Sequence, residues 1–437
     1  MKYFLLPLGC ATNKADAERI AGVLSSVGYT TANSEEEADL IGVIACSIRQ
    51  SAIDRVYGKV HQWNQWKKNR TVTTFVSGCM LAADQKKFLK LFDLVVPLDK
   101  VPEMPHMLKE YGTSPVEHFW DITPKRQHQY KALVPIQNGC DKFCTYCAVP
   151  YTRGREVSRS SKDILKEVES LIQSGVRQIT LLGQNVNSYG LDKKGEELSF
   201  AQLLDAVGTM ADKAPHRVWI HYTSPHPRDM TREVLEVQAK HPSLAHYLNL
   251  PLQSGNNDVL KKMNRRYTVE HYMTILDLAR EIIPDMTVST DIIVGFCDET
   301  EEQFTDTCRA VERAHYDIAF IAQYSVRPGV VAEKRFADTV AKDEKKRRHT
   351  VLTDILKIGA LNNNQQLVGK TIPALVETAS RKDGKLLART EGLKSIEFAS
   401  TDESLIGHFV LVRVESCDAW RLSGTYLSAA DENPIRA

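Results

Sequence analysis

The stretch Asn138-Gly-Cys-Asp-Lys-Phe-Cys-Thr-Tyr-Cys147 contains three cysteines, Cys140, Cys144 and Cys147. Three thiolates on one short loop can bind three irons of a cubane cluster and leave the fourth iron without a protein ligand. A structural zinc site needs four closed ligands, and no nearby Cys or His supplies the fourth at a ribbon or finger spacing. A redox pair formed by Cys144 and Cys147 would leave Cys140 unexplained. The spacing therefore predicts an iron–sulfur cluster with one open coordination position.

The three-cysteine loop follows an apolar segment that reads as a strand over 132–137, and the pattern then alternates strand and helix. Six β/α units make an incomplete barrel, which cannot close as the eight-unit form does. Active sites of such barrels lie at the carboxyl ends of the strands. The missing units would leave a lateral opening for a macromolecular substrate. The five further strands are expected over 179–182, 217–222, 247–252, 287–295 and 318–324.

Three more cysteines, Cys10, Cys46 and Cys79, each follow a predicted strand near the N-terminus. The carboxyl ends of parallel strands gather at one crevice, which is where such sheets bind ligands. Three thiols that converge there suggest a second cluster with another open iron. The alternative is that they are three buried small hydrophobic side chains, because free cysteines are often buried. The strands are expected over 3–8, 40–45 and 71–76.

The remaining cysteines, Cys297, Cys308 and Cys417, are scattered and are expected to pack in the interior. Cys297 follows a strand end, so it could approach the active site. Polar residues on the predicted barrel loops receive no role from the sequence. They are Gln184, Asn185, Ser254 and Arg327.

The C-terminal part begins with a charge run, 342–348, that we interpret as the solvated face of a helix. The polar stretch 362–366 reads as a linker. Short β-rich segments follow it and suit a small OB-like barrel, a common oligonucleotide-binding fold. The charges of this tail balance, which weakens the case for strong nonspecific RNA affinity. The segments lie at 372–377, 386–389, 395–399, 408–414 and 420–426.

The composition is that of an ordinary globular enzyme. The chain has 437 residues, which allows two or three domains. Lys+Arg 56 against Asp+Glu 55 gives a net charge of +1, so a nucleic-acid surface must be local. We expect no membrane span, because no apolar stretch is long enough. The apolar run 3–8 is interrupted by Pro7 and is too short for a secretory signal, and nine cysteines make a disulfide framework improbable. We therefore expect a cytoplasmic enzyme.

These motifs together resemble a known family. Cys-x3-Cys-x2-Cys at the start of a β/α barrel resembles the radical S-adenosylmethionine (SAM) superfamily. The N-terminal cysteine motifs and a small C-terminal domain similar to TRAM domains make the whole chain resemble the methylthiotransferases. The N-terminal motifs are Gly9-Cys10-Ala11-Thr12-Asn13, Ala45-Cys46-Ser47 and Ser77-Gly78-Cys79.

Within that family, two segments resemble the branch that modifies N6-dimethylallyladenosine in tRNA. They are Cys46-Ser-Ile-Arg49 and Val149-Pro-Tyr-Thr-Arg-Gly154. Ala11-Thr12 stands where that branch usually has Gln-Met, Ala45 where a polar residue is usual, and Cys297 where proline is common. None of these departures touches a cluster cysteine.

The resemblance implies a fold of three parts. An N-terminal parallel α/β domain would span 1–118, an incomplete (β/α)6 radical SAM core 126–360, and a TRAM-like β-barrel 363–430. It also implies a 4Fe–4S cluster on Cys140, Cys144 and Cys147, whose free iron would bind the amino and carboxylate groups of SAM. Tyr146 would lie against the adenine of SAM, and SAM cleavage would yield a 5′-deoxyadenosyl radical.

A second 4Fe–4S cluster, on Cys10, Cys46 and Cys79, would hold or deliver sulfur that a second SAM methylates. The methylthio group would be placed on C2 of an isopentenylated adenosine beside the tRNA anticodon. The implied partners are tRNA and an electron donor such as flavodoxin or ferredoxin, and the implied state is a monomer. Two alternatives stay open: the same chemistry on a ribosomal protein aspartate or on threonylcarbamoyladenosine, and a noncatalytic RNA-binding iron–sulfur protein.

Overall fold

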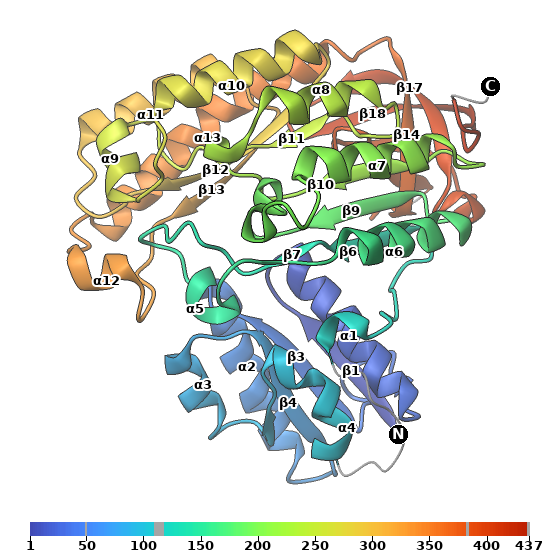
Figure 1. Cartoon of the computed structure of the whole chain (residues 1–437), viewed down its shortest axis with the longest axis vertical. Coiled ribbons are helices and arrows are strands. Elements are labelled where there is room, and N and C mark those ends of the chain that lie inside the picture. The colour runs from blue at the N-terminus through green and yellow to red at the C-terminus, as the bar shows by residue number, and fades with distance from the viewer. Residues whose placement is uncertain (49, 109–117, 382–383, 435–437) are drawn as a thin grey trace. The chain divides into compact units, whose positions relative to one another are not determined.

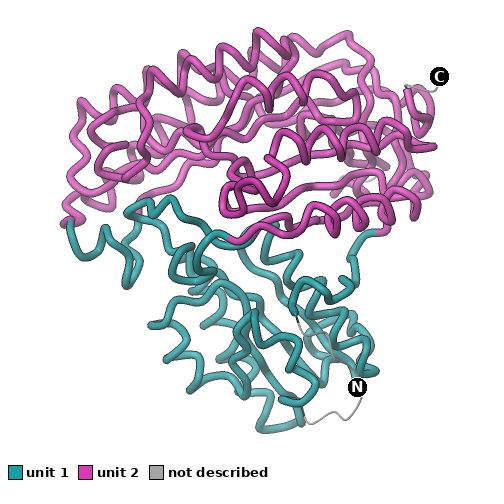
Figure 2. The backbone as a smooth tube through the Cα atoms, in the orientation of Figure 1, with its two compact units in different colours: residues 1–128, 138–156, 325–335 teal, residues 129–137, 157–324, 336–437 magenta. Residues whose placement is uncertain are grey.

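The computed structural model describes residues 1–48, 50–108, 118–381 and 384–434. Its backbone divides into two compact units (Figure 2). Unit 1 comprises residues 1–128, 138–156 and 325–335, and unit 2 comprises 129–137, 157–324 and 336–437. These units group the residues differently from the domain bounds drawn above, which remain predictions. Arg49, in one of the family motifs, lies outside the described residues.

Unit 1 is built on a parallel sheet of five strands in the order β2-β1-β3-β4-β5, as predicted for the N-terminal part. The strands are β1 Lys2–Pro7, β2 Thr30–Thr31, β3 Leu40–Cys46, β4 Thr73–Cys79 and β5 Leu94–Val95. The helices of this unit are α1 Ala11–Ser26, α2 Gln50–Trp66, α3 Ala82–Phe88, α4 Met104–Met107, α5 Val149–Arg153 and α12 Val331–Arg335.

Helices cover both faces of this sheet (Figure 1). Successive side chains of a strand point to opposite faces, and β3 shows this directly. Ile41 and Val43 pack in the core that contains α2, whereas Leu40 and Ile44 pack in the core that contains α1. A strand that is buried on both faces reads as a continuous apolar run, which is how β3 could be predicted from its sequence.

Unit 2 contains the six predicted barrel strands, arranged as two parallel sheets of three strands. The orders are β10-β9-β6 and β11-β12-β13, and an isolated bridge pairs Ile220 of β10 with Leu244, which lies just before β11. Within the described residues β6 and β13 have no ladder between them, so the incomplete barrel is confirmed. The strands are β6 Lys131–Pro135, β9 Gln178–Leu182, β10 Trp219–Tyr222, β11 Tyr247–Asn249, β12 Thr287–Val294 and β13 Ile318–Gln323.

The helices of unit 2 cover the outside of the barrel sheets and pack with them in one large apolar core. Two of them begin with a full capping box, in which Ser199 and Gln202, or Thr300 and Gln303, satisfy each other's backbone N–H groups. No described helix is both long enough and apolar enough to cross a membrane. These helices are α6 Ser161–Gln173, α7 Phe200–Asp212, α8 Arg232–Lys240, α9 Asn257–Lys262, α10 Val269–Ile282, α11 Glu301–Ala314 and α13 Lys342–Gln365.

The C-terminal strands close into a small barrel in the order β14-β15-β16-β18-β17, which confirms the predicted β-barrel. Its interior is apolar, with Val376, Ile396, Phe398 and Val412 fully buried. The strands are β14 Thr371–Ala379, β15 Lys385–Thr390, β16 Ser395–Ala399, β17 Phe409–Cys417 and β18 Arg421–Ala429. Two short strands, β7 Gln137–Asn138 and β8 Val157–Ser158, and several 3₁₀ turns complete the described elements.

The linker predicted at 362–366 is wrong, because α13 continues through Gln365. Asn364 explains the difference, since it is buried and its amide group donates to the carbonyl oxygens of Asp418 (2.9 Å) and Ala419 (3.2 Å). Its side-chain oxygen accepts a hydrogen bond from Lys394 at 2.7 Å. Polar side chains that suggested a linker thus anchor the helix to the C-terminal barrel.

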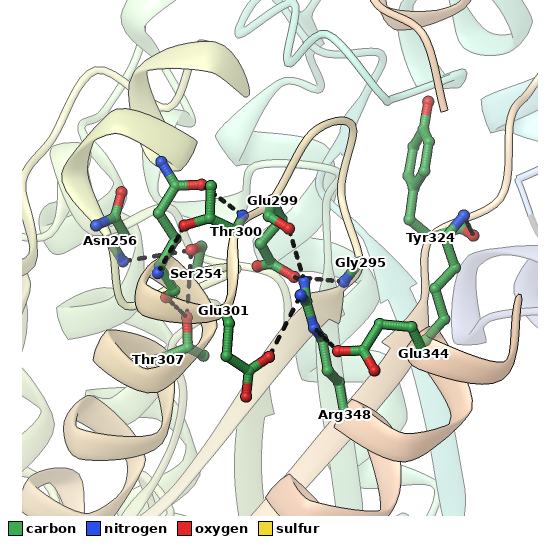
Figure 3. Close-up of polar contacts among 12 residues, drawn as sticks. Ser254, Asn256, Gly295, Glu299, Thr300, Glu301, Thr307, Tyr324, Glu344 and Arg348 are labelled. Carbon is green, nitrogen blue, oxygen red and sulfur yellow. Dashed lines mark hydrogen bonds and ion pairs between the residues drawn. The ribbon is translucent and has the colours of Figure 1, made fainter. Parts of the chain in front are cut away.

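The solvated helix face predicted for 342–348 is wrong for two of its residues, Lys345 and Arg348, which are buried. Arg348 donates to the carboxylate of Glu299 at 2.9 Å, and that carboxylate accepts the backbone N–H of Gly295 at 2.6 Å (Figure 3). Buried charges persist only when they are paired and hydrogen-bonded. The charge run therefore fixes α13 against the loop that follows β12.

Asn364→Ala should destabilise unit 2, because it leaves the carbonyl groups of Asp418 and Ala419 without a donor. The expected loss is about 1–3 kcal/mol in the free energy of unfolding. The matched control is Asn362→Ala, whose side chain is exposed on the same helix and should leave stability unchanged. Urea unfolding followed by circular dichroism measures both. Equal stability of the two variants would contradict the anchoring role of Asn364.

Candidate iron–sulfur centres

The first three thiols lie at the carboxyl ends of neighbouring strands in unit 1. Cys10 is the residue before α1, and Cys46 and Cys79 are the last residues of β3 and β4. Cys46 and Cys79 are directly paired across the two strands. The sequence placed both just beyond their strands, and the ladder extends far enough to include them. The prediction that the three cysteines share one edge of the sheet is confirmed.

The strand order places this edge at a topological switch point. After β1 the chain adds β2 on one side, and β3 then pairs with β1 on the other side. In an open parallel sheet, the crevice at such a reversal is where ligands bind. Cys10 follows β1 and Cys46 ends β3, so these two thiols flank the reversal.

Gly9 leaves room for the Cys46 thiol beside the end of β1. Its φ of +99° is a conformation that residues with side chains rarely adopt. A Cβ atom at Gly9 would lie 2.8 Å from Cys46 Sγ, closer than real atoms come. The absent side chain therefore leaves the space that the Cys46 thiol occupies.

Asn13 ties the strand ends together around the thiols. Its buried amide group donates to the carbonyl oxygens of Leu8 and Ala45, both at 2.7 Å. Its side-chain oxygen accepts hydrogen bonds from the thiol of Cys79 at 3.2 Å and from Arg153 at 3.0 Å. One asparagine thus joins the carboxyl ends of β1 and β3 and contacts Cys79.

Arg153 is the charged group of this site. Its Nε–H donates to Cys79 Sγ at 2.8 Å, and its Nη2 forms an ion pair with Asp16. The two charged side chains are 3% and 2% exposed. A buried ion pair is stable only when further hydrogen bonds satisfy its remaining polar atoms, and these bonds hold both side chains in one position.

Burial raises the pKa of two of the thiols. It raises the pKa of Cys79 to about 12, although the positive charge of Arg153 acts in the opposite direction. Burial also raises the pKa of Cys140 to about 11. At neutral pH these bare thiols are protonated, so a metal centre must displace their protons when it binds.

Cys140, Cys144 and Cys147 lie on a loop within residues 138–156, which belong to unit 1. The N–H of Cys140 donates to the carbonyl of Gly154 at 3.3 Å, which closes the base of the loop. At its far end the N–H of Cys147 donates to the carbonyl of Cys144, and the N–H of Val149 donates to Cys147 Sγ at 3.4 Å. Gly139, with a φ of +78°, passes so close to Arg155 that a Cβ atom would collide with its carbonyl oxygen.

The donor sets fit iron–sulfur clusters. Six cysteine thiols lie in two groups at the ends of rigid elements, and four of the six are buried. Across the described residues, no three His, Cys, Asp or Glu side chains are arranged to hold a single metal ion. A cubane cluster differs from a single ion, because each thiolate binds a separate iron and the three sulfur atoms need not meet at one point.

The other predicted residues take less decisive positions. Tyr146 is half-buried on the loop between Cys144 and Cys147, and its contact with adenine stays a prediction. Cys297 is buried, and Cys308 packs against the barrel core. Three of the unassigned polar residues form hydrogen bonds within the protein. Asn185 donates to Asp229 at 3.0 Å, Arg327 donates to Gln50 at 2.8 Å, and Ser254 lies 3.4 Å from the hydroxyl of Thr307 (Figure 3).

Sequence reasoning gave no role to Asn13, Asp16 or Arg153. A signal for the first two was present, because residues three apart lie on one face of a helix. Asn13 and Asp16 are therefore neighbours on a helix whose other buried positions include Ala17 and Ile20. Arg153 carries no such signal, since its contacts with Asn13 and Cys79 link distant parts of the chain.

Solved structures share the general fold. A radical S-adenosylmethionine methyltransferase, TsrM, from Kitasatospora setae aligns with a TM-score of 0.54 at 12% identity, covering 76% of this chain and 73% of that one. The cobalamin-dependent S-adenosylmethionine radical enzyme OxsB aligns with a TM-score of 0.51 at 12% identity, covering 81% of this chain and 56% of that one. Likeness at this identity supports the fold alone.

Three family models match in the same order as the structural parts. The uncharacterized protein family UPF0004 matches residues 2–97, the radical SAM superfamily 134–311 and the TRAM domain 365–427. The cysteines of the first group lie in the first match, and those of the second group lie in the second.

Curated relatives match almost the whole chain, and those described here share one name, tRNA-2-methylthio-N(6)-dimethylallyladenosine synthase. The relative from Christiangramia forsetii is 36% identical over 99% of this chain and 95% of its own. Relatives from Dictyoglomus thermophilum (36%, covering 98% and 99%) and Thermotoga petrophila (37%, covering 97% and 96%) agree. Identity above one third over nearly the full length, with all three domain models in order, shows that the chain belongs to the tRNA-2-methylthio-N(6)-dimethylallyladenosine synthase family of radical SAM enzymes.

Proposed function

We propose that this chain adds a methylthio group to C2 of N6-isopentenyladenosine adjacent to the tRNA anticodon. The observation that carries the proposal is the pair of three-thiol groups, in a chain that matches relatives of this name over nearly its full length. A noncatalytic RNA-binding iron–sulfur protein could also hold clusters on these thiols, but the relatives that match this chain over nearly its full length are named as a synthase.

The second cysteine group would hold the cluster that binds and cleaves SAM. Cys140, Cys144 and Cys147 would each bind one iron and leave the fourth for the amino and carboxylate groups of SAM. When bound, this cluster supplies the electron that cleaves SAM and so permits attack on an unactivated carbon. The short hydrogen-bonded loop holds the three thiols in place, and Tyr146 would contact the adenine.

Cys10, Cys46 and Cys79 would hold the second cluster, which would hold or deliver the sulfur atom. Cys46 and Cys79 are 2% and 1% exposed, so water has little access to the sulfur atoms there. Exclusion of water protects reactive groups from side reactions. Arg153 would orient Cys79 as a ligand, because its Nε–H donates to the sulfur, whereas the hydrogen bond from the Cys79 thiol to Asn13 would be lost with the thiol proton.

The partners follow from the chemistry. A low-potential donor such as flavodoxin or ferredoxin would supply electrons, and a second SAM would supply the methyl group. The substrate would be the anticodon loop of tRNA, approached by a monomer in the cytoplasm. The C-terminal barrel supports this role, since small closed β-barrels of this type commonly bind oligonucleotides.

A deletion strain complemented with this chain tests the substrate. Wild type and Cys417→Ala should restore the 2-methylthio derivative of isopentenyladenosine in bulk tRNA, and Cys144→Ala should yield none. Cys417 is a suitable control because it is a cysteine at the end of β17, outside both groups. Mass spectrometry of nucleosides from digested tRNA provides the measurement.

The alternative substrates give different results in the same strains. A methylthio group found only on threonylcarbamoyladenosine, or only on an aspartate of a ribosomal protein, would overturn the proposed substrate while leaving the chemistry intact. Full modification by Cys144→Ala would overturn the proposed ligand set.

The space beside Gly9 yields a test of the first group. Gly9→Ala should displace the Cys46 thiol and reduce the bound iron from about eight to about four atoms per chain. Gly28→Ala is the matched control, because Gly28 also has a positive φ (+88°) but has nothing within 4 Å of the added atom. Iron analysis after anaerobic reconstitution measures both. An unchanged iron content in Gly9→Ala would show that this space does not matter.

A further inference from the structure

We propose that Arg153 is a positioning residue that sets the reduction potential of the N-terminal iron–sulfur site through its hydrogen bond to Cys79. This inference deepens the proposed function and rests on the second cluster proposed above. Arg153 lies six residues after Cys147 in the sequence, and it contacts a cysteine of the other group, Cys79.

The contact between Arg153 and Cys79 is short and secluded. Arg153 Nε lies 2.8 Å from Cys79 Sγ, and the side chain of Arg153 is 3% exposed. A charged N–H donor is worth more in such a place than in water, because the low local dielectric strengthens its field. Hydrogen bonds to sulfur and local charge are among the factors that set the potential of an iron–sulfur cluster.

The partners of Arg153 fix the direction of its guanidinium group. Asp16 pairs with Nη2, and Asn13 accepts from the same nitrogen at 3.0 Å. The guanidinium is planar with donors at fixed angles, so contacts at Nη2 also determine where Nε–H points. Lysine would keep the charge but not this fixed direction. Asp16 therefore acts as the counter-charge and as the orienting group.

Arg153 also closes the base of the three-cysteine loop. Its Nη1 donates to the side-chain oxygen of Asn138 at 3.1 Å, and the amide group of Asn138 donates to the backbone carbonyl of Arg153 at 3.2 Å. Asn138 lies two residues before Cys140, and Arg153 ends the helix that follows Cys147. One guanidinium group therefore contacts the supports of both cysteine groups.

The physical consequence is a directional effect on the potential. A reduced cluster carries one more negative charge than an oxidised one, so a nearby positive donor stabilises the reduced form and raises the potential. Loss of Arg153 removes this donor and leaves the carboxylate of Asp16 without its cation, which lowers the potential further. Loss of the Asp16 charge should have the opposite effect.

The experiment uses the full chain with Cys140, Cys144 and Cys147 all changed to Ala, so that only the N-terminal cluster contributes to the signal. After anaerobic reconstitution, a spectroelectrochemical titration gives the midpoint potential. Arg153→Met should lower the midpoint potential. At the midpoint potential of the parent chain, the ratio of reduced to oxidised cluster should fall at least tenfold in this variant. For a one-electron couple this is a shift of about 59 mV.

Three further variants separate the role from a general loss of structure. Asp16→Asn should raise the midpoint, because it removes a negative charge and keeps the donor. Arg153→Lys should recover part of the shift, because it keeps the charge. Arg155→Met is the matched control: Arg155 pairs with Asp141, its side chain is 76% exposed, and its loss should not move the midpoint.

The outcomes distinguish the inference from the function on which it rests. A parent chain that binds no cluster overturns the second cluster together with this proposal. A parent chain with about four irons whose midpoint is the same in Arg153→Met and Asp16→Asn overturns the role of Arg153 alone. If Arg153→Met does not fold, Arg153→Lys decides, because it keeps the charge and loses the directed donor: a midpoint below that of the parent chain supports the proposal, and an unchanged or higher one overturns it.

Discussion

The cost of ionising a buried thiol is the constraint on which both cysteine sites depend. Burial raises the pKa of Cys79 to about 12 and that of Cys140 to about 11, so neither is a thiolate at neutral pH on its own. Thiolate is the form that binds metal, and a bound metal centre provides the positive charge that makes it stable. A cluster on either group would therefore have to stabilise the thiolates, and at Cys79 the positive charge of Arg153 acts in the same direction.

Parallel strands bring distant cysteines together with little additional structure. The carboxyl ends of β1, β3 and β4 lie side by side because the strands are neighbours in one sheet, so residues 10, 46 and 79 share an edge. The remaining requirement is close packing at that edge, which Gly9 and Asn13 provide. The loop of Cys140 achieves the same grouping locally, by short spacing and hydrogen bonds across its base.

Local patterns in the sequence predicted most of the architecture. Continuous apolar runs identified the strands. The spacing of Cys140, Cys144 and Cys147 indicated one group, and the position of Cys10, Cys46 and Cys79 after predicted strands indicated the other. Residues whose role depends on distant partners were misread or missed. Arg348 resembled part of a solvated face because its buried partner, Glu299, lies 49 positions away in the chain. Asn364 resembled part of a linker for the same reason, and Arg153 contacts a cysteine 74 positions away.

The central claim is that the two cysteine groups each hold a cluster of their own. Iron and sulfide analysis of anaerobically reconstituted protein, together with Mössbauer spectra, tests it most directly in wild type and in the two triple variants. We predict about eight irons per chain in wild type and about four when either Cys10, Cys46 and Cys79 or Cys140, Cys144 and Cys147 are replaced by Ala. About four irons in wild type, unchanged by replacing the first group, would contradict the account.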